Sequence, residues 1–419
     1  MNNIQLYEHQ AKALDLTKDL NRVAYYLDMG LGKTFCCSEK IKDLNEKVNL
    51  VICQKSKIND WVDHFNKYYD FKVLDLTKKK DYENFLKDDD TYKVGVINYD
   101  LVWRKNELSK LKNFTLALDE SSLIKNSSAK RTKFISKLQF QNVVLLSGTP
   151  VSGKYEELYS QIRLLGWNIT KTAYWNTYID YVNLDYGGFP IKKVIGYKNV
   201  DRLKAKLREH GAVFMKTEEV IELPSQSFIL INIPTTKHYK KFKKDKVVIT
   251  EDRELVGDTS LTQLLYLRQL CGQYNPYKIA ALKDLLESTD DRIVIFYNFK
   301  AECEIIKDLC TKLGKPTSYI NGDLRDLDAY ENEYNAVTLV QYQAGALGVN
   351  LQKSNKIVYY TLPLSSDLYE QSKKRTHRIN QDRTCFYYLL ICEKSIEVKI
   401  KETLDKRKDF TDELFKECD

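Results

Sequence analysis

The chain of 419 residues is predicted to form two α/β domains, each built around a parallel sheet. Short apolar runs recur along both halves with helical stretches between them, and the length allows two or three separate cores. The runs are continuously apolar, which is typical of strands that helices cover on both faces. The expected strands are 48–53, 94–98, 114–118 and 143–146 in the first half and 292–297, 336–341, 356–361 and 384–391 in the second, with helices at 154–165, 301–313 and 395–417.

The middle of the chain lacks this alternation of apolar runs and helical stretches. Residues 166–225 are rich in aromatic side chains and contain a turn signal at 185–188, followed by a charged helical stretch at 199–210. We therefore expect a small helical insertion and linker over 166–225. A first domain over 1–165 would precede it, and a second domain over 226–419 would follow and end in a helix.

Composition narrows the class of protein. Hydrophobic residues make up 43% and charged residues 30%, as in soluble globular proteins. Because no stretch has the apolar length of a membrane span and the first residues do not form a signal peptide, we expect a cytoplasmic protein without a membrane partner. The nine cysteines include no CxxC pair, which disfavours a structural zinc site.

The net charge of +8 is compatible with a nucleic-acid partner but does not establish one. Basic runs occur at 78–80 and at 237–246 (KHYKKFKKDK). Such runs are commonly solvated helix faces. The second run either has that role or contacts a phosphate backbone.

A glycine-rich segment at 28–34 (DMGLGKT) has the composition of a phosphate cradle. Gly30 and Gly32 would allow the backbone to approach phosphates, Lys33 would reach the terminal phosphates, and Thr34 would bind Mg²⁺. The generic pattern has Gly at position 27, where this chain has Leu. The run before the cradle is compatible with a strand or a helix, and a helix is expected after it.

Two further segments follow expected strands. Asp119 and Glu120 end the run 114–118, and a pair of carboxylates there suits one ligand of Mg²⁺ and one group that aligns the attacking water. Residues 147–150 (SGTP) follow the run 143–146. A turn of small residues at the carboxyl end of a parallel strand is either a place for a ligand or an ordinary turn.

Two arginines near the end of the chain complete the candidate chemistry. Arg375 and Arg378 are three residues apart, so a helix would place both guanidinium groups on one face. Guanidinium groups fork onto phosphate oxygens, and Gln371 and Gln381 frame this pair. The segment is typical of an arginine finger that completes an ATP site from a second domain.

These segments stand in the order found in helicase superfamily two, and the chain resembles the Swi/Snf-like ATPases over nearly its whole length. Eleven segments carry the resemblance: LYEHQ (6–10), DMGLGKT (28–34), VNLVICQKSKINDW (48–61), NYD (98–100), DESSLIKN (119–126), LSGTP (146–150), EELYSQIRLLG (156–166), RIVIFYNF (292–299), INGD (320–323), QAGALGVNL (343–351) and QSKKRTHRINQ (371–381). The compact length is similar to that of members from prokaryotic and viral genomes.

The resemblance implies two RecA-like domains in tandem, with ATP and Mg²⁺ in the cleft between them. The implied catalytic residues are Lys33, Asp119, Glu120, Arg375 and Arg378, with Thr34 and Asp119 on the metal. The implied nucleotide contacts are Gln10, which would read adenine, and Gly30, Gly32, Lys33, Thr34, Gly348 and Gln381.

The resemblance also implies duplex DNA as the track, gripped through phosphates and so independently of sequence. The implied contacts are Lys55, Ser56, Asn98, Tyr99, Asn298, Gln343 and Gly345. Tyr99 and Asn298 could instead pack or cap at strand ends. Partners from replication or recombination fit such a protein, which we expect to be a monomer.

Four positions depart from the family pattern: Ser122 replaces a common His, Gln343 a Lys, Ala346 a Gly and Asn380 a Gly. The catalytic side chains are all present, so we expect an ATP-dependent DNA translocase or helicase. Two alternatives stay open. One is an RNA-dependent ATPase or strand-separating helicase, and the other is a nucleotide-dependent DNA clamp or loading scaffold that does not move.

Overall fold

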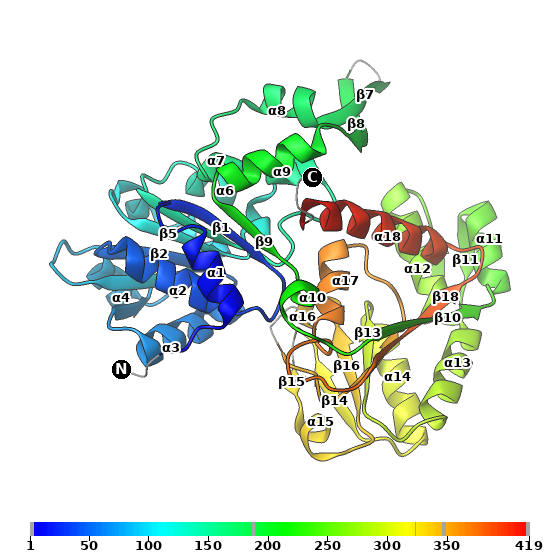
Figure 1. The fold of residues 1–419 in the computed structure, drawn as a ribbon. Helices are drawn as coiled ribbons and strands as arrows, with labels where there is room; N and C mark the ends of the chain where they lie inside the picture. The colour runs from blue at the N-terminus through cyan, green and yellow to red at the C-terminus, as the bar shows by residue number, and fades with distance from the viewer. Residues whose placement is uncertain (1–3, 187–188, 323, 346–348, 416–419) are drawn as a thin grey trace. The chain divides into compact units, whose positions relative to one another are not determined.

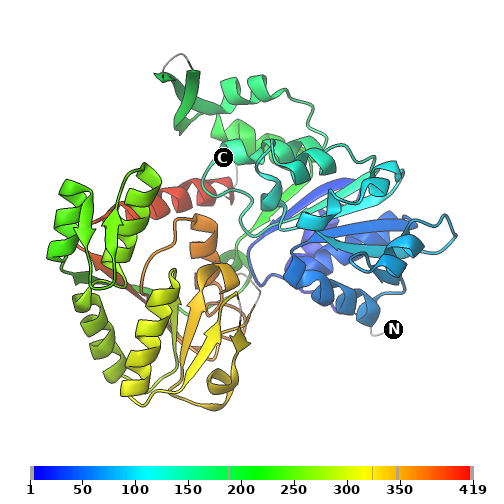
Figure 2. The same cartoon turned by 180° about the vertical axis from the view of Figure 1, so that it is seen from behind.

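The structure is a computed structural model that describes residues 4–186, 189–322, 324–345 and 349–415. The chain forms two compact units, which Figures 1 and 2 show from opposite sides. Unit 1 comprises Met1–Ile221 with Asp409–Asp419, and unit 2 comprises Glu222–Lys408. Each unit is described by itself. Within the described ranges, no helix has both the length and the apolar character needed to cross a membrane.

Unit 1 is built on a sheet of seven parallel strands in the order β3-β4-β2-β5-β6-β1-β9. Because every pair is parallel, the carboxyl ends of all seven strands lie on one edge of the sheet. The strands are β1 (Arg22–Leu27), β2 (Val48–Cys53), β3 (Lys72–Asp75), β4 (Lys93–Asn98), β5 (Thr115–Asp119), β6 (Asn142–Leu146) and β9 (Ala212–Met215).

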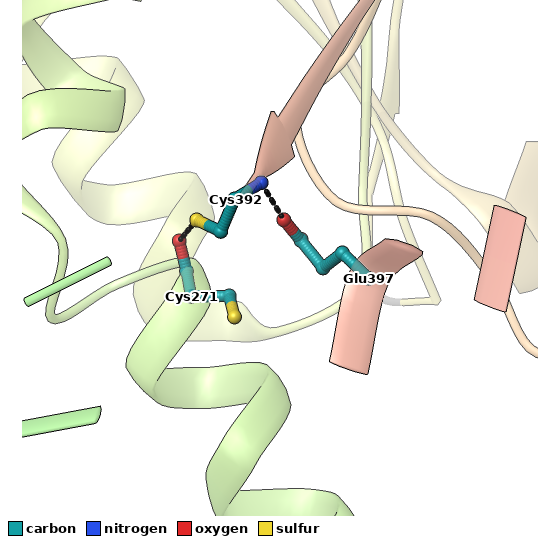
Figure 3. Close-up of side chains that lie close together, drawn as sticks. All are labelled: Cys271, Cys392 and Glu397. Atoms are coloured by element: carbon teal, nitrogen blue, oxygen red, sulfur yellow. Dashed lines mark hydrogen bonds between the residues drawn. The ribbon is translucent and has the colours of Figure 1, made fainter. Parts of the chain in front are cut away.

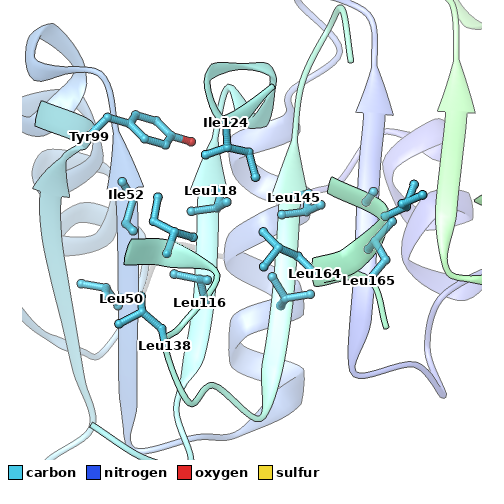
Figure 4. Close-up of a cluster of buried hydrophobic side chains, with 14 of the residues drawn as sticks. Leu50, Ile52, Tyr99, Leu116, Leu118, Ile124, Leu138, Leu145, Leu164 and Leu165 are labelled. Carbon is cyan, nitrogen blue, oxygen red and sulfur yellow. The ribbon is translucent and has the colours of Figure 1, made fainter. Parts of the chain in front are cut away.

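Helices cover both faces of this sheet. One face packs on α1 (Glu8–Asp15), α2 (Lys33–Leu44) and α3 (Ile58–Tyr68). The other packs on α4 (Lys79–Phe85), α5 (Tyr99–Val102), α6 (Lys130–Ile135), α7 (Tyr159–Leu164), α8 (Lys171–Tyr178) and α9 (Val200–Glu209). Figure 4 shows the second core, where Leu116 and Leu118 of β5 meet Ile124, Leu138 and Leu164. Alternate residues of each strand thus enter alternate cores, which is why the runs read as continuously apolar.

Shorter elements connect these layers in unit 1. They are the 3-10 turns η1 (Lys55–Lys57), η2 (Asn106–Lys110), η3 (Ser121–Ile124) and η4 (Tyr155–Leu158), the antiparallel hairpin of β7 (Ile179–Tyr186) and β8 (Phe189–Tyr197), and α10 (Thr217–Val220).

Unit 2 contains a second sheet of seven strands in the order β10-β18-β17-β13-β16-β14-β15, parallel except for the β14–β15 pair. Its strands are β10 (Gln226–Ile233), β13 (Ile293–Tyr297), β14 (Thr317–Ile320), β15 (Arg325–Asp326), β16 (Val337–Gln341), β17 (Lys356–Tyr359) and β18 (Cys385–Cys392).

Two buried clusters again fill the space above and below this sheet. One includes α11 (Lys237–Asp245), α12 (Ser260–Cys271), α13 (Pro276–Glu287), α14 (Lys300–Lys312) and the hairpin of β11 (Val247–Ile249) and β12 (Glu254–Val256). The other includes α15 (Asp328–Asn332), α16 (Tyr342–Gly345), α17 (Ser366–Lys373) and α18 (Ile396–Phe415).

The predicted fold class is confirmed, and all eight predicted strands are present within one or two residues at each end. The expected organisation of the middle differs from the structure. Residues 166–221 pack with unit 1, and β9 extends its sheet beside β1, so this part of the chain is not a separate segment. The short run of β9 escaped notice because four residues give too little periodicity to recognise.

Candidate active site

The phosphate cradle lies between β1 and α2, at the carboxyl edge of the first sheet. Gly30 and Gly32 adopt φ angles of 88° and 72°, in the left-handed region that glycine enters without strain. Lys33 is the first residue of α2, and its Nζ donates to the backbone carbonyls of Leu27 (2.8 Å) and Asp28 (3.0 Å). The cradle thus joins a strand to a helix N-terminus, where backbone amides favour an anion.

Gln10 touches the cradle from α1. Its Nε2 donates to the Leu31 carbonyl at 3.2 Å, and His9 Nε2 lies 3.0 Å from the same oxygen. A Cβ atom added to Gly32 would lie 2.0 Å from Gln10 Nε2. Glycine at this position therefore serves both the backbone angle and the close packing of Gln10, which holds α1 against the cradle.

The two predicted carboxylates lie at the end of β5, two strands from β1. Asp119 Oδ2 accepts a hydrogen bond from the Trp61 indole (2.9 Å). Glu120 is left-handed (φ 58°), and its Oε1 accepts from Ser122 Oγ (2.8 Å) and Ser147 Oγ (2.7 Å). Ser122, which stands where the family often has His, thus orients the carboxylate that we expect to align water.

Lys33 and the carboxylates form one electrostatic group. Burial lowers the pKa of Lys33, while the nearby Glu120 and Asp119 carboxylates act in the opposite direction. Burial likewise raises the pKa values of Asp119 and Glu120, and Lys33 opposes both shifts. Desolvation therefore dominates for each group, which makes this cation and these acids responsive to a charged ligand.

The SGTP turn also reaches the cradle. A Cβ atom on Gly148 would lie 3.1 Å from Met29 Cγ and 3.4 Å from Lys33 Nζ. The structure thus brings together residues 28–34, 119–120 and 147–148, which the sequence analysis identified separately.

The sequence analysis did not identify Gln161, whose side chain joins these loops. Gln161 of α7 is buried, and its Oε1 accepts from Tyr26 (3.0 Å) and Ser121 (2.8 Å), while its Nε2 donates to the Pro150 carbonyl (2.8 Å). Gln161 therefore links β1 to the two loops that follow β5 and β6. Its only signal in the sequence was an amide side chain between Ser160 and Ile162, which nothing in the local pattern sets apart.

Arg375 and Arg378 do not lie on a helix, so a helix face does not hold the two guanidinium groups together. The α17 helix ends at Lys373, and residues 374–380 form turns and a bend, in which Arg375 N donates to the Ser372 carbonyl (3.3 Å) and His377 N to the Lys373 carbonyl (3.2 Å). Arg375 is buried and Arg378 is half-buried. The side chain of Gln381 ties these turns to another segment, since it donates to the carbonyl of Thr376 and to those of Gln352 and Ser354.

Arg378 is held by the side chain of Asn350, to which its guanidinium donates a hydrogen bond. Among the residues that the structure describes, no carboxylate lies within ion-pair distance of Arg378, and burial lowers the pKa of its guanidinium. The contacts of Arg378 therefore do not support a role in a structural ion pair within unit 2. Gln381, which was expected to contact the nucleotide, instead donates from its amide nitrogen to the backbone carbonyls of Gln352 (2.9 Å) and Ser354 (3.0 Å) in this structure. Gly348, also expected at the nucleotide, lies outside the described residues.

Asn380 occupies a left-handed position, with φ 71°, where the family has Gly. Asparagine tolerates this region better than other residues with side chains. We expect Asn380→Gly to leave the free energy of unfolding nearly unchanged and Asn380→Ala to lower it by about 1 kcal/mol. Denaturant midpoints of the full chain would test this, and equal midpoints for the two variants would contradict the role of the backbone angle.

The expected DNA contacts fall into two groups. Lys55, Ser56 and Gln343 are exposed, and they follow the carboxyl ends of β2 and β16 together with Gly345. Asn98 and Tyr99 are buried. The Tyr99 hydroxyl donates to the Asp119 carbonyl (3.0 Å), and Asn298 Nδ2 donates to Thr361 Oγ1 (2.9 Å) and the Leu362 carbonyl (3.1 Å). Packing at strand ends, the alternative for Tyr99 and Asn298, matches these contacts.

A cluster of possible metal ligands lies in unit 2, formed by Cys271, Cys392 and Glu397 (Figure 3). It does not fit a metal. Lys278 Nζ occupies both carboxylate oxygens of Glu397, at 2.7 and 2.8 Å, and the Cys392 amide donates to one of them. Burial also raises the pKa of Cys271 well above its usual value, which keeps the thiol protonated.

Family models match most of the chain. A model of the SNF2-related domain matches residues 26–275, and a model of the helicase conserved C-terminal domain matches residues 277–380. The chain belongs to the SNF2-related family of helicase-like ATPases. The matched ranges include the cradle, the carboxylates, the SGTP turn and the two arginines.

Named relatives of this SNF2-related chain come from several organisms. One is the SWI/SNF-related matrix-associated actin-dependent regulator of chromatin subfamily A member 1 of Mus musculus, 24% identical over 90% of this chain and 40% of that protein. Another is the putative ATP-dependent helicase/translocase YwqA of Bacillus subtilis, 23% identical over 92% of this chain and 46% of that protein. The chain thus spans less than half the length of either relative. A solved structure, the Sulfolobus solfataricus SWI2/SNF2 ATPase core in complex with dsDNA, is 20% identical with a TM-score of 0.47, covering 98% of this chain and 92% of that one.

Proposed function

We propose that this SNF2-related chain hydrolyses ATP with Mg²⁺ and uses the energy to move along duplex DNA. The observation that carries the proposal is the meeting of Lys33, Glu120 and Gly148 at one edge of the first sheet. The terminal phosphate of a nucleotide in the cradle would lie beside Lys33. Glu120, fixed by two serine hydroxyls, would then be placed to align a water molecule.

The residues around the cradle fit a nucleotide with its metal ion. Gly30 has open space around the position of a Cβ atom, and among the described residues the Nζ of Lys33 donates only to the backbone carbonyls of Leu27 and Asp28. Thr34 and Asp119 offer hydroxyl and carboxylate oxygens, which Mg²⁺ prefers. Bound Mg²⁺ would neutralise charge on the phosphates. Gln10, on the other side of Gly32, is the candidate for the adenine contact.

The arginines of unit 2 would complete the site when the two units close on ATP. Arg378 suits this role because it is a half-buried cation without a carboxylate partner among the described residues. The guanidinium of Arg378 would then exchange its hydrogen bond with Asn350 for contacts with the phosphates of the nucleotide. Closing and reopening in each cycle of hydrolysis would move the DNA contacts of one unit relative to those of the other.

For the DNA track, we propose Lys55, Ser56, Gln343 and Gly345 as direct contacts. Asn98, Tyr99 and Asn298 would instead shape the loops that carry them. Tyr99 supports this division most clearly, since its hydroxyl binds the main chain at Asp119 and so joins a DNA-side loop to the catalytic carboxylates.

Binding through phosphates predicts a strong effect of salt. We expect the logarithm of the affinity for duplex DNA to fall linearly with the logarithm of the salt concentration, with a slope of about −0.9 for each phosphate neutralised. Titrations by fluorescence anisotropy at several salt concentrations would measure it. A flat dependence would contradict a backbone-bound track, and faster ATP hydrolysis with RNA than with duplex DNA would favour the RNA-dependent alternative.

A further inference from the structure

A basic helix in unit 2 is not used by the proposed ATPase. The helix is α11 (Lys237–Asp245), which follows β10 and carries five lysines in nine residues. It packs beside β11 and α12 at the outside of the unit (Figure 1).

Four of the five lysines of α11 lie on one side of the helix. Tyr239 and Phe242 point into the core, where Phe242 contacts the ring of Tyr266 and the Tyr239 hydroxyl accepts a hydrogen bond from the Ile396 amide (2.8 Å). At 100° per residue, four exposed lysines fall within about 100° on the opposite side of the helix. We call these the basic face: Lys237, Lys240, Lys241 and Lys244.

This arrangement is unfavourable for the helix alone. Lys237 and Lys241, and likewise Lys240 and Lys244, are like charges at i,i+4, and each such pair costs about 0.2–0.5 kcal/mol. Lys237 also stands in the first turn, where the helix dipole disfavours a cation. Within the described part of the chain, none of the four forms an ion pair.

The other basic run provides a contrast. Lys78 pairs with Asp75 (3.4 Å) and Lys79 with Glu83 (3.9 Å), so charges of this chain offset most of that run. The lysines of the basic face form no such pair among the described residues, and the one carboxylate of α11 is Asp245 at its end. The charge of the basic face is therefore available to an anion outside the chain.

Its position favours nucleic acid as that anion. The α11 helix begins at the carboxyl end of β10, and Leu230 of β10 is level with Phe296 of β13 through the intervening strands. The α11 helix thus begins just beyond the same sheet edge that carries Asn298, after a strand that lies three spacings, or roughly 14 Å, from β13. From Lys237 to Lys244 it extends about 10 Å, which corresponds to about three phosphates of one strand when the length is measured along the duplex axis.

We propose that the basic face of α11 binds the phosphate backbone of duplex DNA, as a contact additional to those implied by the helicase motifs. This inference rests on the proposed function in that the same duplex serves as the track. The contact would lengthen the stretch of DNA that unit 2 covers. It would also hold the duplex while the motif residues release one backbone phosphate and bind the next.

The test compares two triple variants of the full chain that remove equal charge. One is Lys240→Gln, Lys241→Gln, Lys244→Gln, and its control is Lys78→Gln, Lys79→Gln, Lys80→Gln. Glutamine keeps the helix propensity of lysine, so both should fold. The readout is anisotropy of a labelled duplex at several salt concentrations. We expect the α11 variant to bind at least about tenfold more weakly near 0.1 M salt, with a slope shallower by about 2 to 3, and the control to change little.

Three further measurements make the outcome decisive. The matching Lys→Arg triple variant of α11 should bind DNA like the natural chain. ATP turnover at saturating duplex should stay unchanged in all variants. If the natural chain showed no DNA-stimulated turnover, the proposed function would be contradicted, but the binding comparison between the two Gln variants could still be made. Polyglutamate serves as a probe for an acidic protein in place of DNA. The proposal would be overturned by an unchanged salt slope in the α11 Gln variant or by an equal loss of DNA binding in both Gln variants. It would also be overturned if the α11 Gln variant lost binding to polyglutamate but kept its binding to DNA.

Discussion

Glu120→Gln is expected to lower ATP turnover by roughly 10²–10⁴-fold and to leave ATP affinity unchanged. The carboxylate accepts hydrogen bonds from Ser122 and Ser147, and an amide in its place would keep the shape of the loop but lose the acceptor that aligns water. Single-turnover hydrolysis and equilibrium binding of a fluorescent ATP analogue would separate the two effects.

Lys33→Ala should abolish turnover as well, but with weakened nucleotide binding, because the cation that faces the phosphates is lost. Glu83→Gln is a suitable control, since this exposed acid of α4 lies away from the cradle and should retain full activity. Near-normal turnover by folded Glu120→Gln protein would contradict the role assigned to this carboxylate.

Arg378→Ala should lower DNA-stimulated turnover by roughly 10³-fold or more and leave ATP affinity nearly intact. The side chain lies far from the cradle in sequence and would act only on the transition state in the closed form. Arg378→Lys should not restore activity, because an ammonium group cannot make the forked contact. We expect Arg375→Ala to have a similar or milder effect. Steady-state rates with and without duplex DNA would measure these losses.

Arg383→Ala provides the matched control for the arginines. Arg383 is exposed and lies five residues further along, and among the described residues its guanidinium donates only to the Lys353 carbonyl. A merely structural role for Arg378 would show as a lower thermal midpoint together with the lost activity. Normal DNA-stimulated hydrolysis by folded Arg378→Ala protein would exclude the finger.

The sequence predicted the strands well because helices bury them on both faces. The run 48–53 coincides with β2, and Asp119 and Glu120 follow β5 as expected. Short edge strands such as β3 and β9 carry too few apolar residues to be recognised before the sheet is assembled. The run before the cradle, which was compatible with either a strand or a helix, is β1.

The turns at Arg375 and Arg378 could not be predicted for a different reason. The spacing of the two arginines fits a helix face but does not require a helix, and Gln381 donates to the carbonyls of Gln352 and Ser354, contacts that the local sequence does not reveal. Gln161 was missed for a related reason. Its three partners lie in separate segments of the chain, which only the folded sheet brings together.

The most direct test of the central claim is displacement of a third strand from a DNA triplex. A motor that moves along duplex DNA would release the third strand only with ATP, and Glu120→Gln protein, which should bind both ATP and DNA, would release none. We predict ATP-dependent release by the natural chain and its loss in this variant. A chain that hydrolyses ATP in response to duplex DNA but leaves the triplex intact would contradict movement and favour a clamp or loading scaffold.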